Sequence, residues 1–311
     1  MRGPRYLPEP SLVEITVRTI QSRFLLRLTE IVVKTIIGVI ARAQERYEVA
    51  VIDVKQMNSH LHLLCFFEDG QQMSRFMRYV NSNLARKVGR LAGWSGPFWE
   101  RRYSHVVVTE EEAAQVERLK YCLQNGCKEG LVWKPHDWPG ATGVNAMLSG
   151  EMKIEGEWLD LTLMFHARER GESTATKNFV KRHTLKLSKL PCWEHLNDDD
   201  YCKHVQGLVE TIADETAAMH ERNGSVPLGV RELRKLRPNQ RAANPDRSPK
   251  PLVHAASRER RRRFREAWRL FVDSFLAASQ RLRDGDRNAT FPPGSFPPRL
   301  PFVPLTAGPS G

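Results

Sequence analysis

The chain has 311 residues and a mass of 35.7 kDa, enough for one large domain or two ordinary ones. Hydrophobic residues make up 41% and charged residues 27%, a globular rather than a disordered composition. The 48 basic residues outnumber the 36 acidic ones, and the net charge of +12 favours a polyanionic partner, either nucleic acid or an acidic membrane surface. The alternative is a basic but otherwise ordinary enzyme.

Several classes of protein are excluded early. The longest apolar stretch, residues 31–43, is too short to span a bilayer and is interrupted by Lys34. No apolar core follows the first ten residues, so we expect no secretory signal. The five cysteines are odd in number and form no Cys-x-x-Cys pair, which favours reduced thiols. We therefore expect a cytoplasmic protein that has no membrane partner.

The first 140 residues alternate between strand and helix patterns. β-branched alternation predicts strands, and apolar residues three or four apart predict helices. In chain order we predict a strand at 12–20, a helix at 28–46, strands at 47–54 and 60–67, a helix at 71–91, a strand at 103–108, and a helix that Thr109 caps and that ends near Asn125. This order predicts an α+β fold, a ferredoxin-like βαββαβ core with an appended helix.

The rest of the chain is predicted to be a mostly helical, basic extension. Its expected elements are two short strands within 148–167, a helix at 201–221, a linker at 245–251, a helix at 258–282 and an extended Pro-rich tail from 291. Residues 224–263 hold 12 basic side chains against 3 acidic ones. We predict three parts: 1–140, then 141–223 as an extension of unknown role, then 224–311 as a basic helical segment with its tail.

Two histidines lie on the predicted third strand. His60 and His62 are two residues apart, so both imidazoles point to the same face of the sheet. Paired neutral imidazoles on a rigid strand are suited to binding a divalent metal. The alternative is two unrelated histidines of a sheet.

Tyr121 and Asn125 add to this pattern. Tyr121 lies about 140° from Val116 around its predicted helix, so it is not on the helix face that we expect to be buried. Asn125 is four residues further on and shares the side of Tyr121. A tyrosine hydroxyl one turn away from a metal ligand is suited to attack on a phosphodiester. The alternative is an ordinary surface tyrosine.

Three segments together resemble a known family. The segments MNSHLHLL (57–64), FWERRYSHVVV (98–108) and LKYCLQNGCKEGLVWKPHDWPG (119–140) resemble the single-tyrosine HUH transposases. The start of the chain, PRYLPEPSLVEITVRTIQSRFLL, resembles the branch called REP-associated tyrosine transposases. The resemblance covers roughly residues 4–140 in order, and the extension lies outside it. Two positions depart from the common pattern, Asn58-Ser59 before the first histidine and Gly126 after Asn125.

The resemblance implies an activity and a set of site residues. It implies a metal-dependent endonuclease and strand transferase that cleaves single-stranded, hairpin-forming repeat DNA through a 5′-phosphotyrosine. Tyr121 corresponds to the nucleophile, and His60, His62 and Asn125 correspond to the ligands of Mg²⁺ or Mn²⁺. The protein would be bacterial, nucleoid-associated, and a monomer or a dimer. The alternatives are a domesticated member that binds palindromic DNA or structured RNA without cleaving it, and a basic RNA-binding protein of ferredoxin-like fold.

Other polar clusters suggest further contacts. Arg101 and Arg102 precede the fourth strand and are predicted to hold the DNA backbone. The run Arg260, Arg261, Arg262 and Arg263 favours either phosphate binding or a solvated helix face. A quartet in the extension has ligand types that suit a structural zinc ion, but its six-residue gap is unusually short for such a site: Cys192, His195, Cys202 and His204.

Overall fold

A computed structural model describes residues 4–7, 10–241 and 251–296 of the chain. Its first elements follow the predicted order: β1 (Ser11–Arg18), α1 (Glu30–Tyr47), β2 (Ala50–Gln56), β3 (His60–Phe67), α2 (Gly70–Leu91), β4 (Ser104–Val108) and α3 (Glu112–Leu123). The later elements are α4 (Val144–Leu148), β5 (Lys153–Leu159), α5 (Leu161–Glu169), β6 (Val180–Lys186), α6 (Asp198–Asn223), α7 (Val230–Lys235), β7 (Val253–His254) and α8 (Arg258–Arg283). Short 3₁₀ turns lie at Ile20–Ser22, Pro135–Asp137, Thr176–Phe179 and Pro191–Trp193.

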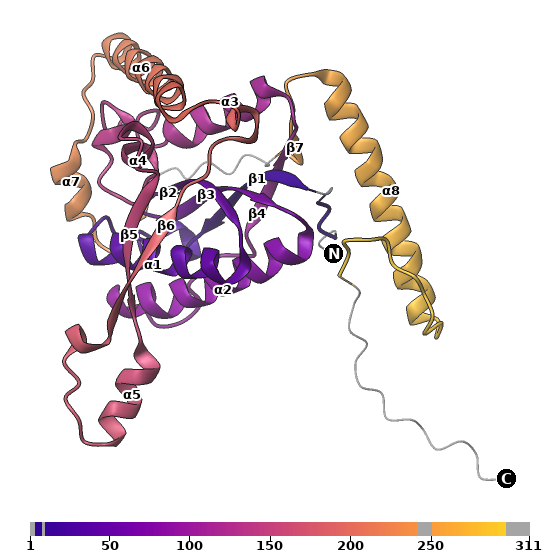
Figure 1. The fold of residues 1–311 in the computed structure, drawn as a ribbon, viewed down its shortest axis with the longest axis horizontal. Helices are drawn as coiled ribbons and strands as arrows, with labels where there is room; N and C mark the ends of the chain where they lie inside the picture. The colour runs from indigo at the N-terminus through magenta and orange to yellow at the C-terminus, as the bar shows by residue number, and fades with distance from the viewer. Residues whose placement is uncertain (1–3, 8–9, 242–250, 297–311) are drawn as a thin grey trace.

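The central sheet has the strand order β2-β3-β1-β4-β7. The first four strands pair in antiparallel fashion, and the short strand β7 joins the edge strand β4 in parallel. Helices α1 and α2 lie on one side of the sheet, and α3 lies on the other (Figure 1). This arrangement confirms the predicted α+β, ferredoxin-like core with an appended helix.

The two faces of the sheet differ in chemistry because successive side chains of a strand point to opposite faces. On the side of α1 and α2, Val13, Ile15 and Leu63 are almost completely buried. On the side of α3, His62 lies opposite Thr16 in the register of β1 and β3, and opposite Lys55 in the register of β2 and β3. These polar side chains are also buried. The sheet therefore carries a buried polar row on the face that α3 covers.

Two predicted boundaries near these strands were wrong. Tyr47 ends α1 instead of starting a strand, because Glu48 adopts a left-handed conformation (φ 52°) that closes the helix. Thr109 does not cap α3, since Glu111 occupies the N-cap position without a side-chain cap bond. The Thr109 hydroxyl donates to Glu111 Oε2 instead (2.8 Å).

The prediction of two strands within 148–167 was half right. The strand β5 is followed at once by the helix α5, which Asp160 caps by accepting a hydrogen bond from the N–H of Leu163. Leu, Met and Ala favour helix over strand, which explains why this segment turns helical. The partner of β5 is β6, and this hairpin crosses α1 and carries α5 away from the sheet (Figure 1).

The hairpin packs closely on α1 through two glycines. A Cβ atom on Gly38 would lie 2.3 Å from the carbonyl oxygen of Glu157, and one on Gly156 would lie 2.2 Å from the backbone nitrogen of Gly38. The neighbouring side chains of α1, including Ile36 and Ile40, are fully buried. Helix α1 is therefore covered by the sheet on one side and by the hairpin on the other.

The long helices of the extension were predicted closely. Helix α6 begins three residues before the predicted start because Asn197 caps it, and its side chain accepts from the N–H of Asp200 (2.8 Å). Helix α8 begins at the predicted residue, capped by Ser257. The predicted linker falls almost entirely outside the described residues, as does the tail beyond residue 296. Within the described part of the chain, no helix combines the length and apolarity needed to cross a membrane.

Candidate functional site

His60 and His62 lie side by side on β3. Their ring centroids are 4.9 Å apart and the rings meet edge to face, so both imidazoles occupy the face that the two-residue spacing predicts. His62 is buried, and His60 is partly exposed beside the hydroxyl of Ser59, whose Oγ lies 3.1 Å from His60 Nδ1. The pair therefore has one deep and one shallow member.

A buried glutamate that the sequence analysis missed holds His62 in place. Glu14 lies in the central strand β1, and its Oε1 is 2.7 Å from His62 Nδ1. An ionised carboxylate can only accept hydrogen bonds, so Nδ1 carries the proton. In a neutral ring the lone pair then resides on Nε2, the nitrogen that can ligate a metal ion. Histidines that bind metals commonly donate their other N–H to a carboxylate in this way.

Two more side chains donate hydrogen bonds to Glu14. Arg118 of α3 donates from Nη1 to Glu14 Oε2 (2.7 Å), and both side chains of this ion pair are buried. The Thr16 hydroxyl donates to Glu14 Oε1 (3.2 Å) and also lies 3.2 Å from His62 Nδ1. Buried charges are stable only when they are paired and hydrogen-bonded, and Glu14 meets both conditions. The network joins β1, β3 and α3 into one polar cluster.

Tyr121 lies on α3 over this cluster. The centroid of its ring is 6.1 Å from that of His62, in an edge-to-face arrangement. The Arg118 guanidinium lies 5.0 Å from the centre of the Tyr121 ring, and Lys128 Nζ lies 3.8 Å from it. Burial, and then the negative charge of Glu14, raise the pKa of Tyr121 to about 12. The phenol is therefore protonated at neutral pH, and two cations lie close to its ring.

Asn125 is buried just past the end of α3. Its Nδ2 donates to the carbonyl oxygens of Tyr121 (2.8 Å) and Cys122 (3.1 Å), which satisfies two carbonyls at the helix terminus. Because the amide nitrogen is used in this way, the amide oxygen is the atom suited to binding a metal. The following Gly126 has φ +99°, and a Cβ there would lie 2.6 Å from Trp138. Both the positive φ and the close approach of Trp138 therefore favour glycine at this position.

Arg101 and Arg102 lie in an exposed segment before β4. The N–H of Glu100 donates to the carbonyl of Arg18, and Arg18 pairs with His60 across the strands. The two arginines are therefore at the end of the sheet that carries the partly exposed His60.

The predicted arginine run of α8 does not form a single unit. Arg260 pairs with Glu110 (2.7 Å), and Arg263 pairs with Glu259 on its own helix. Arg261 donates to the carbonyl of Ala255 (3.1 Å), and Arg262 lies 3.7 Å from Glu266. All four side chains have a partner within the described chain, so the run as such is a weak phosphate site.

The four candidate zinc ligands are used separately. Cys202 Sγ donates to the Met147 carbonyl (3.2 Å), and His204 Nδ1 lies 2.8 Å from the Asp200 carbonyl oxygen. Among the residues that the structure describes, no three His, Cys, Asp or Glu side chains are grouped so that they could hold a metal ion. The structure therefore gives no support to zinc in the extension.

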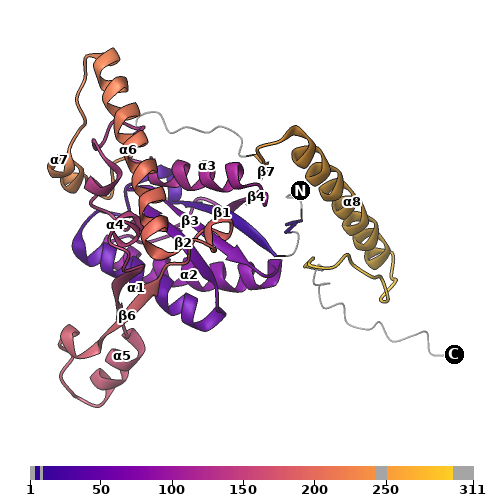
Figure 2. The same ribbon diagram turned by 45° about the horizontal axis from the view of Figure 1, so that its top comes forward.

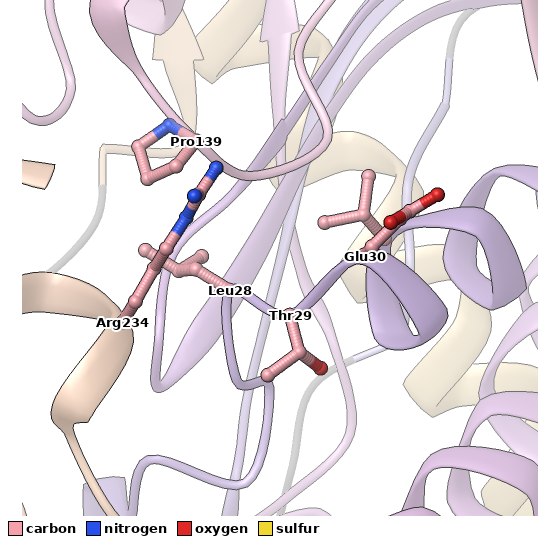
Figure 3. Close-up of a pocket in the computed structure, with 6 residues that line it drawn as sticks. Leu28, Thr29, Glu30, Pro139 and Arg234 are labelled. Carbon is pink, nitrogen blue, oxygen red and sulfur yellow. The ribbon is translucent and has the colours of Figure 1, made fainter. Parts of the chain in front are cut away.

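A pocket of about 500 Å³ lies elsewhere, at the start of α1 (Figure 3). Leu28, Thr29 and Glu30 line one side of it, and Pro139 and Arg234 line the other. None of the predicted site residues lines this pocket.

Comparison with known proteins finds one family that is similar to the first part of the chain. The profile of a family described as "Transposase IS200 like" matches residues 14–121, from Glu14 to Tyr121. This stretch, about a third of the chain, is therefore similar to the IS200-like transposases. The match includes both histidines, whereas Asn125 and the extension lie outside it.

Two solved structures are similar at a lower level. A REP-associated tyrosine transposase bound to a REP hairpin is 16% identical, with a TM-score of 0.40 over 48% of this chain and 86% of that one. A putative transposase from Deinococcus radiodurans R1 is also 16% identical, with a TM-score of 0.28 over 38% of this chain and 95% of that one. No curated protein matches the chain.

Proposed function

We propose that the chain cleaves and rejoins single-stranded DNA beside hairpin-forming repeats, as a metal-dependent transposase of the REP-associated branch. The observation that carries this proposal is the position of the Tyr121 ring beside the imidazole of His62, which itself lies against His60. A potential nucleophile and a potential metal site thus share one partly buried face, as phosphodiester attack requires.

The residues present fit a divalent metal ion. His62 Nε2 is the ligating nitrogen that the Glu14 hydrogen bond selects, and His60 and the amide oxygen of Asn125 would supply the other two protein ligands. Three protein ligands leave coordination positions for phosphate oxygens. When bound, Mg²⁺ or Mn²⁺ would polarise the phosphate and stabilise the charge that develops on it.

Tyr121 would act as the nucleophile. Its Oη forms a bond to phosphorus while the bond from phosphorus to the 3′-oxygen breaks, the phenolic proton leaves, and the 3′-oxygen ends as a hydroxyl. Attack by another 3′-hydroxyl on the phosphotyrosine reverses these changes and reseals the strand, so no external energy source is needed. Arg118 and Lys128, which face the ring, would stabilise the negative charge as the phenol loses its proton.

Arg101 and Arg102 would hold the DNA backbone next to this site. They are exposed and lie at the end of the sheet that carries His60. Arginines bind phosphate oxygens through paired N–H donors, and such contacts fix the register of a nucleic acid on a protein. The double variant Arg101→Gln/Arg102→Gln should therefore bind hairpin DNA more weakly while the folded structure is retained.

The direct test is covalent capture of DNA. Purified protein is incubated with a labelled hairpin carrying a single-stranded flank, taken from the repeat beside its own gene, with Mn²⁺ or with EDTA. We expect an adduct on a denaturing gel that requires Mn²⁺ and is absent from Tyr121→Phe. Tyr79→Phe is the matched control, because Tyr79 is a half-buried tyrosine stacked on Trp158. Selective hairpin binding without any adduct would instead favour a non-cleaving binding protein.

A further inference from the structure

Helix α8 has two faces of opposite character. Phe264 and Phe271 are buried, and both rings contact Tyr6 of the N-terminal segment, with centroids 5.3 and 5.0 Å from its ring. Trp268, between them in sequence, is partly buried against the core. The apolar face of the helix is thus already covered by the protein itself, and the opposite face is exposed to solvent.

The start of α8 is fixed to the domain that is similar to the transposases. Glu111 at the N-cap of α3 accepts hydrogen bonds from the N–H groups of Ala256 (2.9 Å) and Ser257 (3.0 Å). Just before them, β7 pairs with the edge strand β4. Figure 2 shows α8 leaving this junction beside β7, next to the helix that carries Tyr121. The exposed face of α8 therefore has a defined position relative to the domain.

The exposed face carries a row of arginines. Arg258, Arg262, Arg265 and Arg269 follow one another at intervals of three or four residues, so they lie within an arc of about 60° at 100° per residue. Together with Arg261 and Glu266 they line a groove of about 340 Å³. With a rise of 1.5 Å per residue, the row is about 16 Å long.

Three arginines of this row have no acidic partner among the described residues. Arg258, Arg265 and Arg269 are exposed and form no ion pair with any of the described residues. Like charges one turn apart destabilise a helix, and this cost is relieved by an anionic partner that contacts several of them together. A membrane surface fits poorly, because an interfacial helix buries its apolar face in lipid and this apolar face is occupied.

We propose that the row formed by Arg258, Arg262, Arg265 and Arg269 binds the phosphate backbone of duplex DNA. One strand of a duplex carries a phosphate for each 3.4 Å of axis, so a straight row of about 16 Å spans four or five phosphates. The identity of this partner rests on the proposed function, in which the duplex is the stem of the DNA hairpin. The row would add affinity for the stem without taking part in the chemistry at Tyr121.

The test compares salt dependences of binding. The variant Arg258→Gln/Arg265→Gln/Arg269→Gln removes three charges from the row. A control, Arg168→Gln/Arg170→Gln/Lys177→Gln, removes three charges from the exposed arm around α5. Each lost duplex phosphate contact lowers the slope of log K against log salt by about 0.9, so the row variant should lose about 2.7 and bind a hairpin at least about tenfold more weakly at 0.15 M salt. The control should keep the slope of the unmodified protein.

Several results would overturn the proposal. One is an unchanged slope in the row variant with unchanged helix content by circular dichroism; another is an equal loss in the control, which would reflect net charge alone. Row-dependent binding to anionic lipid vesicles with unaltered DNA binding would also do so. A short oligonucleotide without a stem tests the proposed cleavage by Tyr121 separately from the proposed duplex binding by the arginine row, because the row has no duplex to contact. If Tyr121 forms no adduct and the row variant still loses slope, the duplex-binding row stands while the cleavage mechanism fails.

Discussion

Replacing Glu14 by Gln should separate the stability of the fold from the affinity for metal. The donors to the carboxylate include His62 Nδ1–H and Arg118 Nη1–H, both buried and each at 2.7 Å from one of its two oxygens. The amide that replaces it keeps one acceptor and adds a donor. Either the imidazole or the guanidinium therefore loses its partner, and the Arg118 charge remains buried without a counter-ion.

The expected magnitudes follow from this arrangement. Breaking a buried ion pair by removing one partner costs about 3–5 kcal/mol of unfolding free energy. Loss of the carboxylate behind a ligating histidine typically lowers metal affinity by about 10–100-fold, or about 1.4–2.8 kcal/mol. The two effects have different causes. Combining Glu14→Gln with Arg118→Met should restore much of the stability, because no unpaired charge remains, but it should not restore the affinity for metal.

Two measurements decide the outcome. Urea unfolding gives the stability of each variant, and calorimetric titration with Mn²⁺ gives the affinity at a temperature where all variants are folded. Hairpin binding in EDTA serves as a control that should not change. A folded Glu14→Gln variant with an Mn²⁺ affinity within twofold of the unmodified protein would refute the view that Glu14 orients His62 as a ligand.

Three further substitutions probe the fold, two of them close to the site and one at the contact between α1 and the β5–β6 hairpin. Burial raises the pKa of Asp53 to about 7, above its unfolded value of 3.8, so the folded state holds more protons and loses stability as the pH rises between about 4 and 7. Asp53→Asn should remove this slope, which urea midpoints at pH 5 and pH 8 would reveal; equal slopes in both proteins would contradict it. Gly38→Ala should destabilise the fold by about 1–3 kcal/mol or more, since its Cβ would meet the Glu157 backbone at 2.3 Å; an unchanged melting temperature would argue against this contact. Gly126→Ala should lower both stability and Mn²⁺ affinity, because it strains a positive φ and moves Asn125 as its Cβ meets Trp138; retention of both would disprove this coupling.

Local sequence patterns predicted the helices and strands whose apolar residues recur at regular intervals. They missed the elements that form only by contact with another part of the chain. The strand β3 was predicted to the residue, because its apolar side chains alternate with His60 and His62. The two-residue strand β7 has no period of its own and exists only because β4 presents a free edge. The helix α5 lies in the segment 148–167, where a second strand was predicted. Its start, Leu161-Thr162-Leu163, alternates in polarity, but the Asp160 side chain caps a helix there.

Glu14 shows why the candidate site was found only in part. In the segment LVEITVR, Glu14 and Thr16 alternate with Val13 and Ile15, a pattern typical of a strand with one face in solvent. That interpretation fails because β1 is central in the sheet and α3 covers its polar face. A charged residue in a central strand is stable only if another element supplies a counter-charge. Here that element is α3, which brings Arg118 to Glu14 and Tyr121 to His62. The same helix thus provides the neutralising charge and the proposed nucleophile, so a substitution at Arg118 should alter both the stability of the polar row and the position of the Tyr121 ring.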